Sequence, residues 1–316
     1  MVETYIDLNL VIWAIIFMSI VIFGMIAFIL LRRLILWPFQ YWCETRRKVY
    51  TRVLANILKY HERPNRFTSK RFLCARNWMD MISIEEILIE KQNETHNKHL
   101  KEMLARIYEE LGLVKWRIGQ LNSLNVWKRK VAADLLGKSF CKKAIGALTR
   151  ISLRDKDEDV RFIALKSLGK LKAVESIGNI ILLLKRFPYE RCAVVADILI
   201  NFGQDSLPYL CKAINSQYKN TKFWCVRSIA EIDTNFDMPF RKELITRLSE
   251  LLSDDNEETR GYSAICLANL QATEATDKIR GLLQKDEHPF VRSNAAIALG
   301  KLMDPSVIDD LIKALN

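Results

Sequence analysis

The sequence predicts an all-α protein in which one N-terminal transmembrane helix is followed by an α-solenoid of about six helical hairpins. Three observations predict this architecture. Residues 8–31 contain 24 residues without a charged side chain, which is enough for a helix to cross a bilayer. Residues 113–316 repeat a pattern every 31 residues or so, the length of two short helices that must stack on their neighbours. The chain of 316 residues holds only 7 prolines and 11 glycines, too few for a loop-rich or disordered protein.

The uncharged block is predicted to be a membrane span that stays on the protein. Sixteen of its 24 residues are Leu, Ile, Val or Phe. A cleaved signal peptide would have a basic start, an apolar core of about 7–15 residues and small residues at the cleavage site. Here Glu3 and Asp7 precede the block and Arg32 and Arg33 follow it. Because the basic residues follow the span, residues 1–7 should lie outside the cell and the rest of the chain in the cytoplasm.

Residues 32–112 form a basic region that we expect to be helical and to begin at the membrane surface. Residues 32–124 contain 18 Lys/Arg against 10 Asp/Glu, a net charge of +8. Anionic lipid headgroups attract such clusters, and tryptophan favours the membrane interface. Pro38 is expected to break or kink the helix. The residues predicted to lie at the membrane interface are Arg32, Arg33, Trp37, Trp42, Arg46, Arg47 and Lys48.

Three helical segments are expected before the repeats, over residues 44–61, 69–92 and 97–121. In the third segment, apolar residues alternate at spacings of four and three, which is typical of a coiled-coil seam. Gly112 interrupts this run at a position where a helix C-terminus favours glycine. We therefore favour one helix that ends near Leu111 and another that starts the repeat array at Leu113. A coiled-coil dimer through residues 97–121 is the alternative.

The repeat is defined by a basic residue, a small residue three positions later, and Leu-Gly at seven and eight positions. Residues 128–137, 160–169 and 291–300 match it fully, and weaker copies occupy residues 190–199, 221–230 and 259–268. The basic residues are separated by 32, 30, 31, 38 and 32 positions. An insertion near residues 233–239 accounts for the longest interval. The six basic residues are Arg129, Arg161, Arg191, Lys222, Arg260 and Arg292.

This pattern resembles the HEAT repeat, in the short variant related to the phycobilin-lyase type. The form D-x-x-x-V-R-x-x-A-x-x-x-L-G is best matched by residues 157–169 and 288–300, while Leu199 stands where glycine is usual. The layout of one span, a basic helical stretch and HEAT-like units over residues 113–316 is similar to bacterial membrane-anchored HEAT-repeat proteins. That likeness implies a scaffold at the cytoplasmic face of the plasma (inner) membrane that binds a protein partner. The partner it implies is a membrane glycosyltransferase of an envelope or exopolysaccharide system.

The resemblance also implies a structural role for the six basic residues. In HEAT-like arrays such a residue usually pairs with an acidic residue of the adjacent unit. Binding of phosphate or of an acidic partner is the alternative. The acidic residues in the predicted turns that suit this pairing are Asp155, Asp157, Asp159, Asp254, Asp255 and Asp286.

Partner contacts are expected on two parts of the array. Trp127 and Trp224 fall on first helices of repeats and are candidate contacts, with core packing as the alternative. The second helices are expected to form a concave docking face. Their predicted ranges are residues 176–184, 206–213, 242–252 and 307–315.

No catalytic, cofactor-binding or metal-binding motif is evident, so we predict no enzyme activity, cofactor or metal. The sequence contains no P-loop, G-x-S-x-G or G-x-G-x-x-G. His96 and His99 lie on one predicted helix face without a third ligand. His61-Glu62 is similar to the His-Glu pairs of HEAT-type iron hydroxylases, but those enzymes need several copies. The seven cysteines are scattered and suit buried free thiols in a reducing compartment.

Two other functions stay open at the level of the sequence. A bilin-lyase-like HEAT enzyme is suggested by the repeat type alone. A nucleic-acid-binding HEAT protein is suggested by the net charge of +11. The sharpest basic excess follows the span, which favours lipid headgroups over nucleic acid as the target of that charge.

Overall fold

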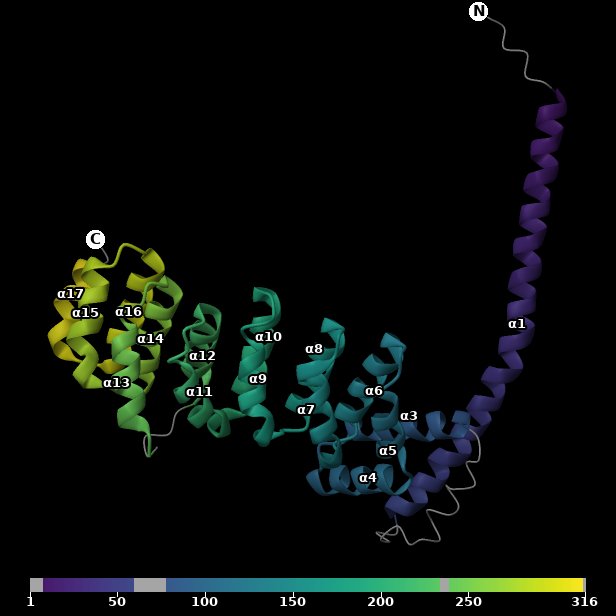
Figure 1. Cartoon of the computed structure of the whole chain (residues 1–316), viewed down its shortest axis with the longest axis horizontal. Helices are drawn as coiled ribbons and strands as arrows, with labels where there is room; N and C mark the ends of the chain where they lie inside the picture. Colours follow the sequence, from purple (N-terminus) through teal and green to yellow (C-terminus); the bar gives the residue numbers. More distant parts are fainter. Residues whose placement is uncertain (1–7, 60–77, 234–238, 315–316) are drawn as a thin grey trace, which may run out of the picture. The chain divides into compact units, whose positions relative to one another are not determined.

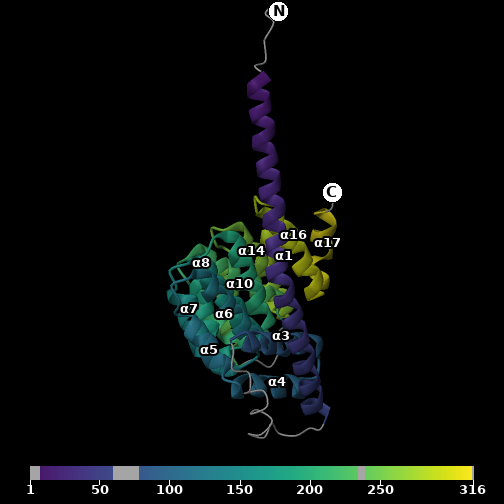
Figure 2. The ribbon, with the colours of Figure 1, turned by 90° about the vertical axis from the view of Figure 1, so that its right-hand side faces the viewer.

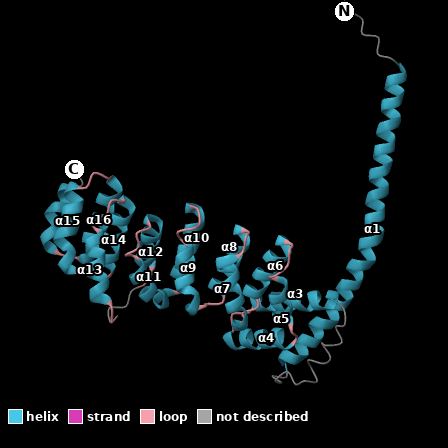
Figure 3. Cartoon of the chain, in the orientation of Figure 1, coloured by secondary structure: helices cyan, strands magenta, loops and turns pink. Residues whose placement is uncertain are grey.

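The computed structural model describes residues 8–59, 78–233 and 239–314, and these residues contain helices and no strand (Figures 1 and 3). The predicted all-α class is therefore confirmed. The chain divides into two compact units, residues 1–96 and 97–316. The second unit thus begins before residue 113, where the sequence places the start of the repeat array.

The first unit is built on one long helix. Helix α1 (Leu8–Lys59) has 52 residues and continues through Pro38, so the predicted break there is wrong. Proline costs about 3 kcal/mol inside a helix, but its fixed φ is helical and the flanking residues favour the helix on both sides. The predicted helix over residues 44–61 is the end of α1. The predicted helix over residues 69–92 overlaps α3 (Trp78–Glu94), and its first part lies outside the described residues.

The end of α1 packs against α3. Tyr50 and Leu54 of α1 are buried, as are Ile84 and Leu88 of α3. Two ion pairs also link these helices, at 2.6 Å between Arg47 and Glu90 and at 3.8 Å between Arg46 and Asp80. The basic residues of α1 near position 46 therefore serve an internal contact of the first unit.

The second unit is a stack of helical hairpins (Figure 1). Seen along the stack in Figure 2, successive hairpins overlap one behind another. Two helices, α4 (Lys98–Glu110) and α5 (Leu113–Gln120), precede six pairs in the described residues, which confirms the predicted solenoid. The first helices of the pairs are α6 (Val126–Lys138), α8 (Glu158–Lys170), α10 (Tyr189–Asn201), α12 (Lys219–Glu231), α14 (Glu257–Asn269) and α16 (Pro289–Leu302). The second helices are α7 (Ile145–Arg154), α9 (Ile177–Leu183), α11 (Leu207–Ala213), α13 (Arg241–Leu251), α15 (Thr276–Lys285) and α17 (Ile308–Lys313).

Gly112 separates α4 from α5, as the sequence predicts. It has a φ of +74°, in the left-handed region that glycine adopts at little cost. The apolar residues before it face the interior, with Leu104 and Ile107 buried. A single coiled-coil helix over residues 97–121 is thus ruled out, because the helix is interrupted at Gly112.

Polar side chains start several first helices. The Asn125 side chain accepts a hydrogen bond from the backbone N–H of Lys128 at 3.3 Å, Asp157 from that of Val160 at 3.0 Å, and Asn256 from that of Thr259 at 2.7 Å. Such N-caps satisfy backbone donors that have no partner inside the helix. Polar residues of the turns therefore fix where these three hairpins begin.

In five of the six hairpins, the link between the two helices contains a residue with a left-handed backbone. Gly203 has a φ of +62°, but the equivalent positions are not glycine. In these five hairpins a short 3₁₀ turn then leads into the second helix. The non-glycine residues with positive φ are Phe140, Lys172, Gln271 and Met303.

The repeated Leu-Gly pair has a packing role. Its leucines Leu136, Leu168 and Leu299 are fully buried. A Cβ atom added at Gly137 would lie 2.5 Å from Cβ of Ser167 and 2.7 Å from its Cα. Helices α6 and α8 thus approach each other more closely there than any side chain at position 137 would permit.

Candidate interaction surfaces of the repeat array

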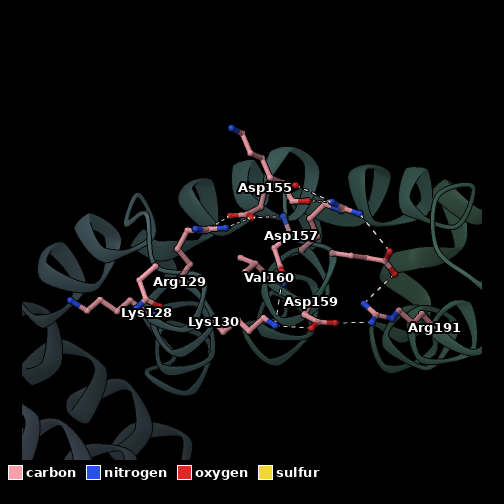
Figure 4. Close-up of polar contacts among 12 residues, drawn as sticks. Lys128, Arg129, Lys130, Asp155, Asp157, Asp159, Val160 and Arg191 are labelled. Atoms are coloured by element: carbon pink, nitrogen blue, oxygen red, sulfur yellow. Dashed lines mark hydrogen bonds and ion pairs between the residues drawn. The ribbon is translucent and has the colours of Figure 1, made fainter.

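The basic residue of the repeat forms a fork with an aspartate of the following turn (Figure 4). Nε and Nη2 of Arg129 donate to the two carboxylate oxygens of Asp155, at 2.8 and 2.9 Å. Arg260 binds Asp286 in the same way, at 2.7 and 2.9 Å. These four side chains are at most 14% exposed. Two parallel charge-assisted hydrogen bonds in a partly buried setting fix the register of neighbouring hairpins.

The same aspartates also organise their own turns. Oδ1 of Asp155 accepts the backbone N–H of Asp157 at 2.9 Å, and the Asp155 carbonyl accepts Nη1 of Arg161 at 2.9 Å. Asp286 repeats this arrangement with the N–H of His288 and with Arg292. Burial would raise the pKa of the Asp155 carboxyl, but hydrogen bonds from Arg129 and the Asp157 N–H lower it below its usual value.

The remaining basic residues of the repeat make other contacts. Arg191 contacts Asp159 at 2.7 Å and Glu158 at 3.2 Å, both at the start of α8. Lys222 pairs with Asp254. Since Arg161 and Arg292 donate to backbone carbonyls of the turns before their helices, all six cationic groups make contacts within the array.

The two candidate tryptophans lie in different surroundings. Trp224 is fully buried, with its ring centroid 4.9 Å from that of Tyr189 and 4.8 Å from that of Phe223. Its side chain is unavailable to a partner, so that prediction is wrong; the rings of Tyr189 on the neighbouring first helix α10 and of Phe223 on α12 itself lie against it. Trp127 is 72% exposed and lines a hollow of about 280 Å³ with Lys130, Lys166 and Lys170. As a partner contact, Trp127 stays a prediction.

The residues predicted at the membrane interface are spread along α1. A continuous helix rises about 1.5 Å per residue, so Arg46 lies about 18 Å beyond the end of the apolar stretch at Leu34. The headgroup region adds only about 5–8 Å on each side of the hydrocarbon core. Arg46 and Arg47 contact α3, whereas Arg32 and Arg33 lie at the C-terminal end of the apolar stretch. The side chains of Trp37 and Trp42 lie outside the described residues.

The positive charge of the array is concentrated in the part that contains α6, α7 and α8. Residues 121–172 contain 13 Lys/Arg against 5 Asp/Glu, a net charge of +8. Residues 173–316 contain 17 against 20, a net charge of −3. The sequence analysis missed this division because it treated the repeats together. Counting charge for each repeat would have revealed it.

A hollow of about 670 Å³ lies within this basic part of the array. It is formed by the turn before α6, the end of α7 and the turn before α8. Leu124 on its rim is 100% exposed, and Arg150, Arg154 and Lys156 line it with exposed side chains. No sequence motif marks this hollow, because its lining comes from two neighbouring hairpins.

The described residues contain no group of three His, Cys, Asp or Glu side chains placed to hold a metal ion. His61 and Glu62 lie outside the described ranges. The described free cysteines pack as small apolar residues, and burial raises the pKa of the Cys141 and Cys192 thiols to about 11.

Known proteins resemble the chain at the level of its repeats. The family model for HEAT repeats matches residues 245–316. No curated protein matches the chain in sequence. The Escherichia coli protein YibA is 20% identical over 73% of this chain and 85% of its own, with a TM-score of 0.45. The HEAT-like repeats protein of the archaeon Thermococcus onnurineus NA1 is 13% identical over 73% of this chain and 98% of its own, with a TM-score of 0.44.

The matched residues correspond to well-defined helices of the structure. Residues 245–316 include most of α13 and the hairpins α14–α15 and α16–α17. Within them, the Arg260–Asp286 fork and the buried Leu299 occupy the positions that the repeat pattern assigns to its basic residue and leucine. Residues 245–316 therefore match HEAT repeats, and they form the last part of the stack of helical hairpins.

Proposed function

We propose that this protein is a non-catalytic HEAT-repeat scaffold, anchored in the plasma (inner) membrane by α1, that holds a protein partner at the cytoplasmic face. A solenoid offers an extended surface built from repeated hairpins. Tethering that surface to the membrane of the partner raises their effective concentration without requiring tight intrinsic binding. The membrane glycosyltransferase implied by the resemblance is the partner class that we propose to test first.

The main support for membrane anchoring is the apolar stretch of α1. Ile15–Leu34 spans 20 residues, is long and apolar enough to cross a membrane, and has none of its residues buried in the described structure. The large apolar side chains there, such as Phe23 at 74% and Phe28 at 66% exposed, need a nonaqueous environment. Arg32 and Arg33, at the C-terminal end of the stretch, favour an N-terminus outside the cell.

Partner binding is supported by surface features of residues 121–172. Their net charge of +8 comes with exposed apolar side chains, including Trp127 and Leu124. Aromatic and arginine side chains dominate binding energy at protein interfaces. The contacts of the six basic residues do not involve Trp127 or Leu124, so these two side chains are available to a partner.

Co-purification tests the proposal. The tagged full chain, expressed at its native level and extracted in mild detergent, should recover a membrane protein in a stoichiometric complex. Trp127→Ala should reduce that recovery about threefold or more, corresponding to a loss near 1 kcal/mol. Met303→Ala is the matched control, because Met303 is similarly exposed at 85% but lies at the other end of the array. A monomer without a partner would contradict the scaffold.

A further inference from the structure

We infer that the hollow between the turn before α6 and the end of α7 is a binding site for an acidic segment of a protein partner. This inference rests on the proposed scaffold function and names the surface and the chemistry of its partner. The hollow is defined by Leu121, Leu124, Arg150, Ile151, Arg154 and Lys156, and measures about 670 Å³. That volume suits several residues of an extended peptide.

The cations of this hollow are available. Arg150, Arg154 and Lys156 have exposed side chains and make no hydrogen bond or ion pair through them to any described residue. Other described basic residues of the array, such as Arg129 and Arg260, bind carboxylates. Three adjacent cations without such partners leave a site that a ligand of opposite charge would complete.

The carboxylates of the hollow are already in use. Asp155 is held by the Arg129 fork, and Asp157 accepts the Val160 N–H at the start of α8. Neither neutralises the rim cations. The Arg129–Asp155 pair also shows, within the hollow itself, the geometry in which a guanidinium takes a carboxylate. Arginine favours planar carboxylates through two parallel hydrogen bonds.

The apolar part of the hollow requires that the bound segment also contain apolar residues. Leu121 is 1% and Ile151 is 8% exposed, so the floor is apolar, while the rim residue Leu124 is 100% exposed. An acidic segment with apolar residues between its carboxylates would cover Leu124 and meet the arginines together. A flat anionic bilayer fits a concave surface with an apolar floor less well than a peptide does.

Fluorescence anisotropy tests the inference on the full chain held in zwitterionic nanodiscs. The probe is a labelled 12-residue peptide of six glutamates and two leucines among glycine and serine, and the comparison peptide has lysine for glutamate. The acidic peptide should bind and the basic one should not. The double variant Arg150→Glu, Arg154→Glu should weaken binding about tenfold or more, through two lost contacts and the added repulsion. Equal binding of the two peptides would overturn the inference.

A matched control distinguishes binding at the hollow from attraction by the overall positive charge of the chain. Lys212→Glu, Lys219→Glu makes the same charge change at exposed positions outside the hollow and should alter affinity less than twofold. Leu124→Ser should weaken binding of the leucine-containing peptide but not of a version with serine for leucine. Equal effects of the two double variants would assign the binding to overall charge and overturn the site.

Two further arms distinguish other outcomes. Dihexanoyl phosphatidylserine should not displace the peptide; displacement at matched concentration, absent with the phosphatidylcholine analogue, would identify lipid as the occupant and overturn the inference. In the co-purification assay, the Arg150→Glu, Arg154→Glu variant should lose the native partner. Full recovery of the partner by this variant would reject the hollow as its binding site but would leave the proposed scaffold function intact. Absence of a partner even with the wild-type chain would reject the scaffold itself.

Discussion

At the residue scale, the Arg–Asp fork of the repeat combines two roles. Asp286 accepts both Arg260 from the preceding hairpin and the His288 N–H of its own turn. The hydrogen bonds from Arg260 lower the pKa of Asp286 below its usual value. These contacts explain why basic and acidic residues recur at fixed places in the sequence, since each fork joins one hairpin to the next.

Asp286→Asn should lower the free energy of unfolding by about 1–3 kcal/mol at pH 7, because a charge-assisted fork is lost. The folded pKa of Asp286 lies below its unfolded value, so its contribution is present above about pH 4 and is lost as pH falls through the folded pKa. The difference between wild type and variant should therefore shrink in acid. Denaturant titrations of the full chain at pH 7 and pH 3 measure it.

Asp277→Asn provides the control for this experiment. Asp277 pairs with Arg280 within one helix turn, and its side chain is 90% exposed. Pairs of this kind contribute less than about 0.5 kcal/mol. A loss at Asp277 as large as that at Asp286 would mean that the fork has no special role.

At the scale of the helices, glycine sets how closely neighbouring hairpins pack. The Leu-Gly pair of the repeat serves two purposes, since leucine fills the core and glycine removes the side chain where the next first helix passes. Gly137 meets Ser167 of α8 in this way, whereas a Cβ atom at Gly300 in α16 would have no described atom within 4 Å. One sequence motif therefore has different energetic consequences in different hairpins.

Gly137→Ala should destabilise the protein by about 1–3 kcal/mol, because the added methyl group forces α6 and α8 apart. Gly300→Ala should leave stability unchanged or raise it by up to about 1 kcal/mol, since alanine favours the helix and meets open space. Thermal unfolding of the two variants compares them directly. Equal destabilisation by both substitutions would contradict the close-contact explanation.

At the scale of the whole chain, the two units carry different parts of the proposed function. The first unit has the apolar stretch Ile15–Leu34 on a helix of 52 residues. The second has the hairpins and an uneven charge, with +8 over residues 121–172 and −3 over residues 173–316. A scaffold of this design would present its basic end as the recognition surface and leave the later repeats to extend it.

Fusions to the C-terminus test the proposed orientation. In a bacterial host, a green fluorescent protein fusion should fluoresce and an alkaline phosphatase fusion should be inactive, because the solenoid would lie in the cytoplasm. Arg32→Glu, Arg33→Glu should weaken this bias by removing the charges nearest the span. The control Arg150→Glu, Arg154→Glu should not, since those residues are far from the span in sequence. Phosphatase activity in the wild-type fusion would reverse the assignment.

The sequence alone determined the helical hairpins, their number, the apolar stretch and the break at Gly112, because helical periodicity, hydrophobicity and glycine preference act over a few neighbouring residues. Only the tertiary structure decided that Trp224 is buried and Trp127 exposed, and that Arg150, Arg154 and Leu124 line one hollow. It also revealed the left-handed links at residues such as Lys172. These features depend on contacts between hairpins, as between Arg129 and Asp155 26 positions apart, which a pattern within one repeat does not contain.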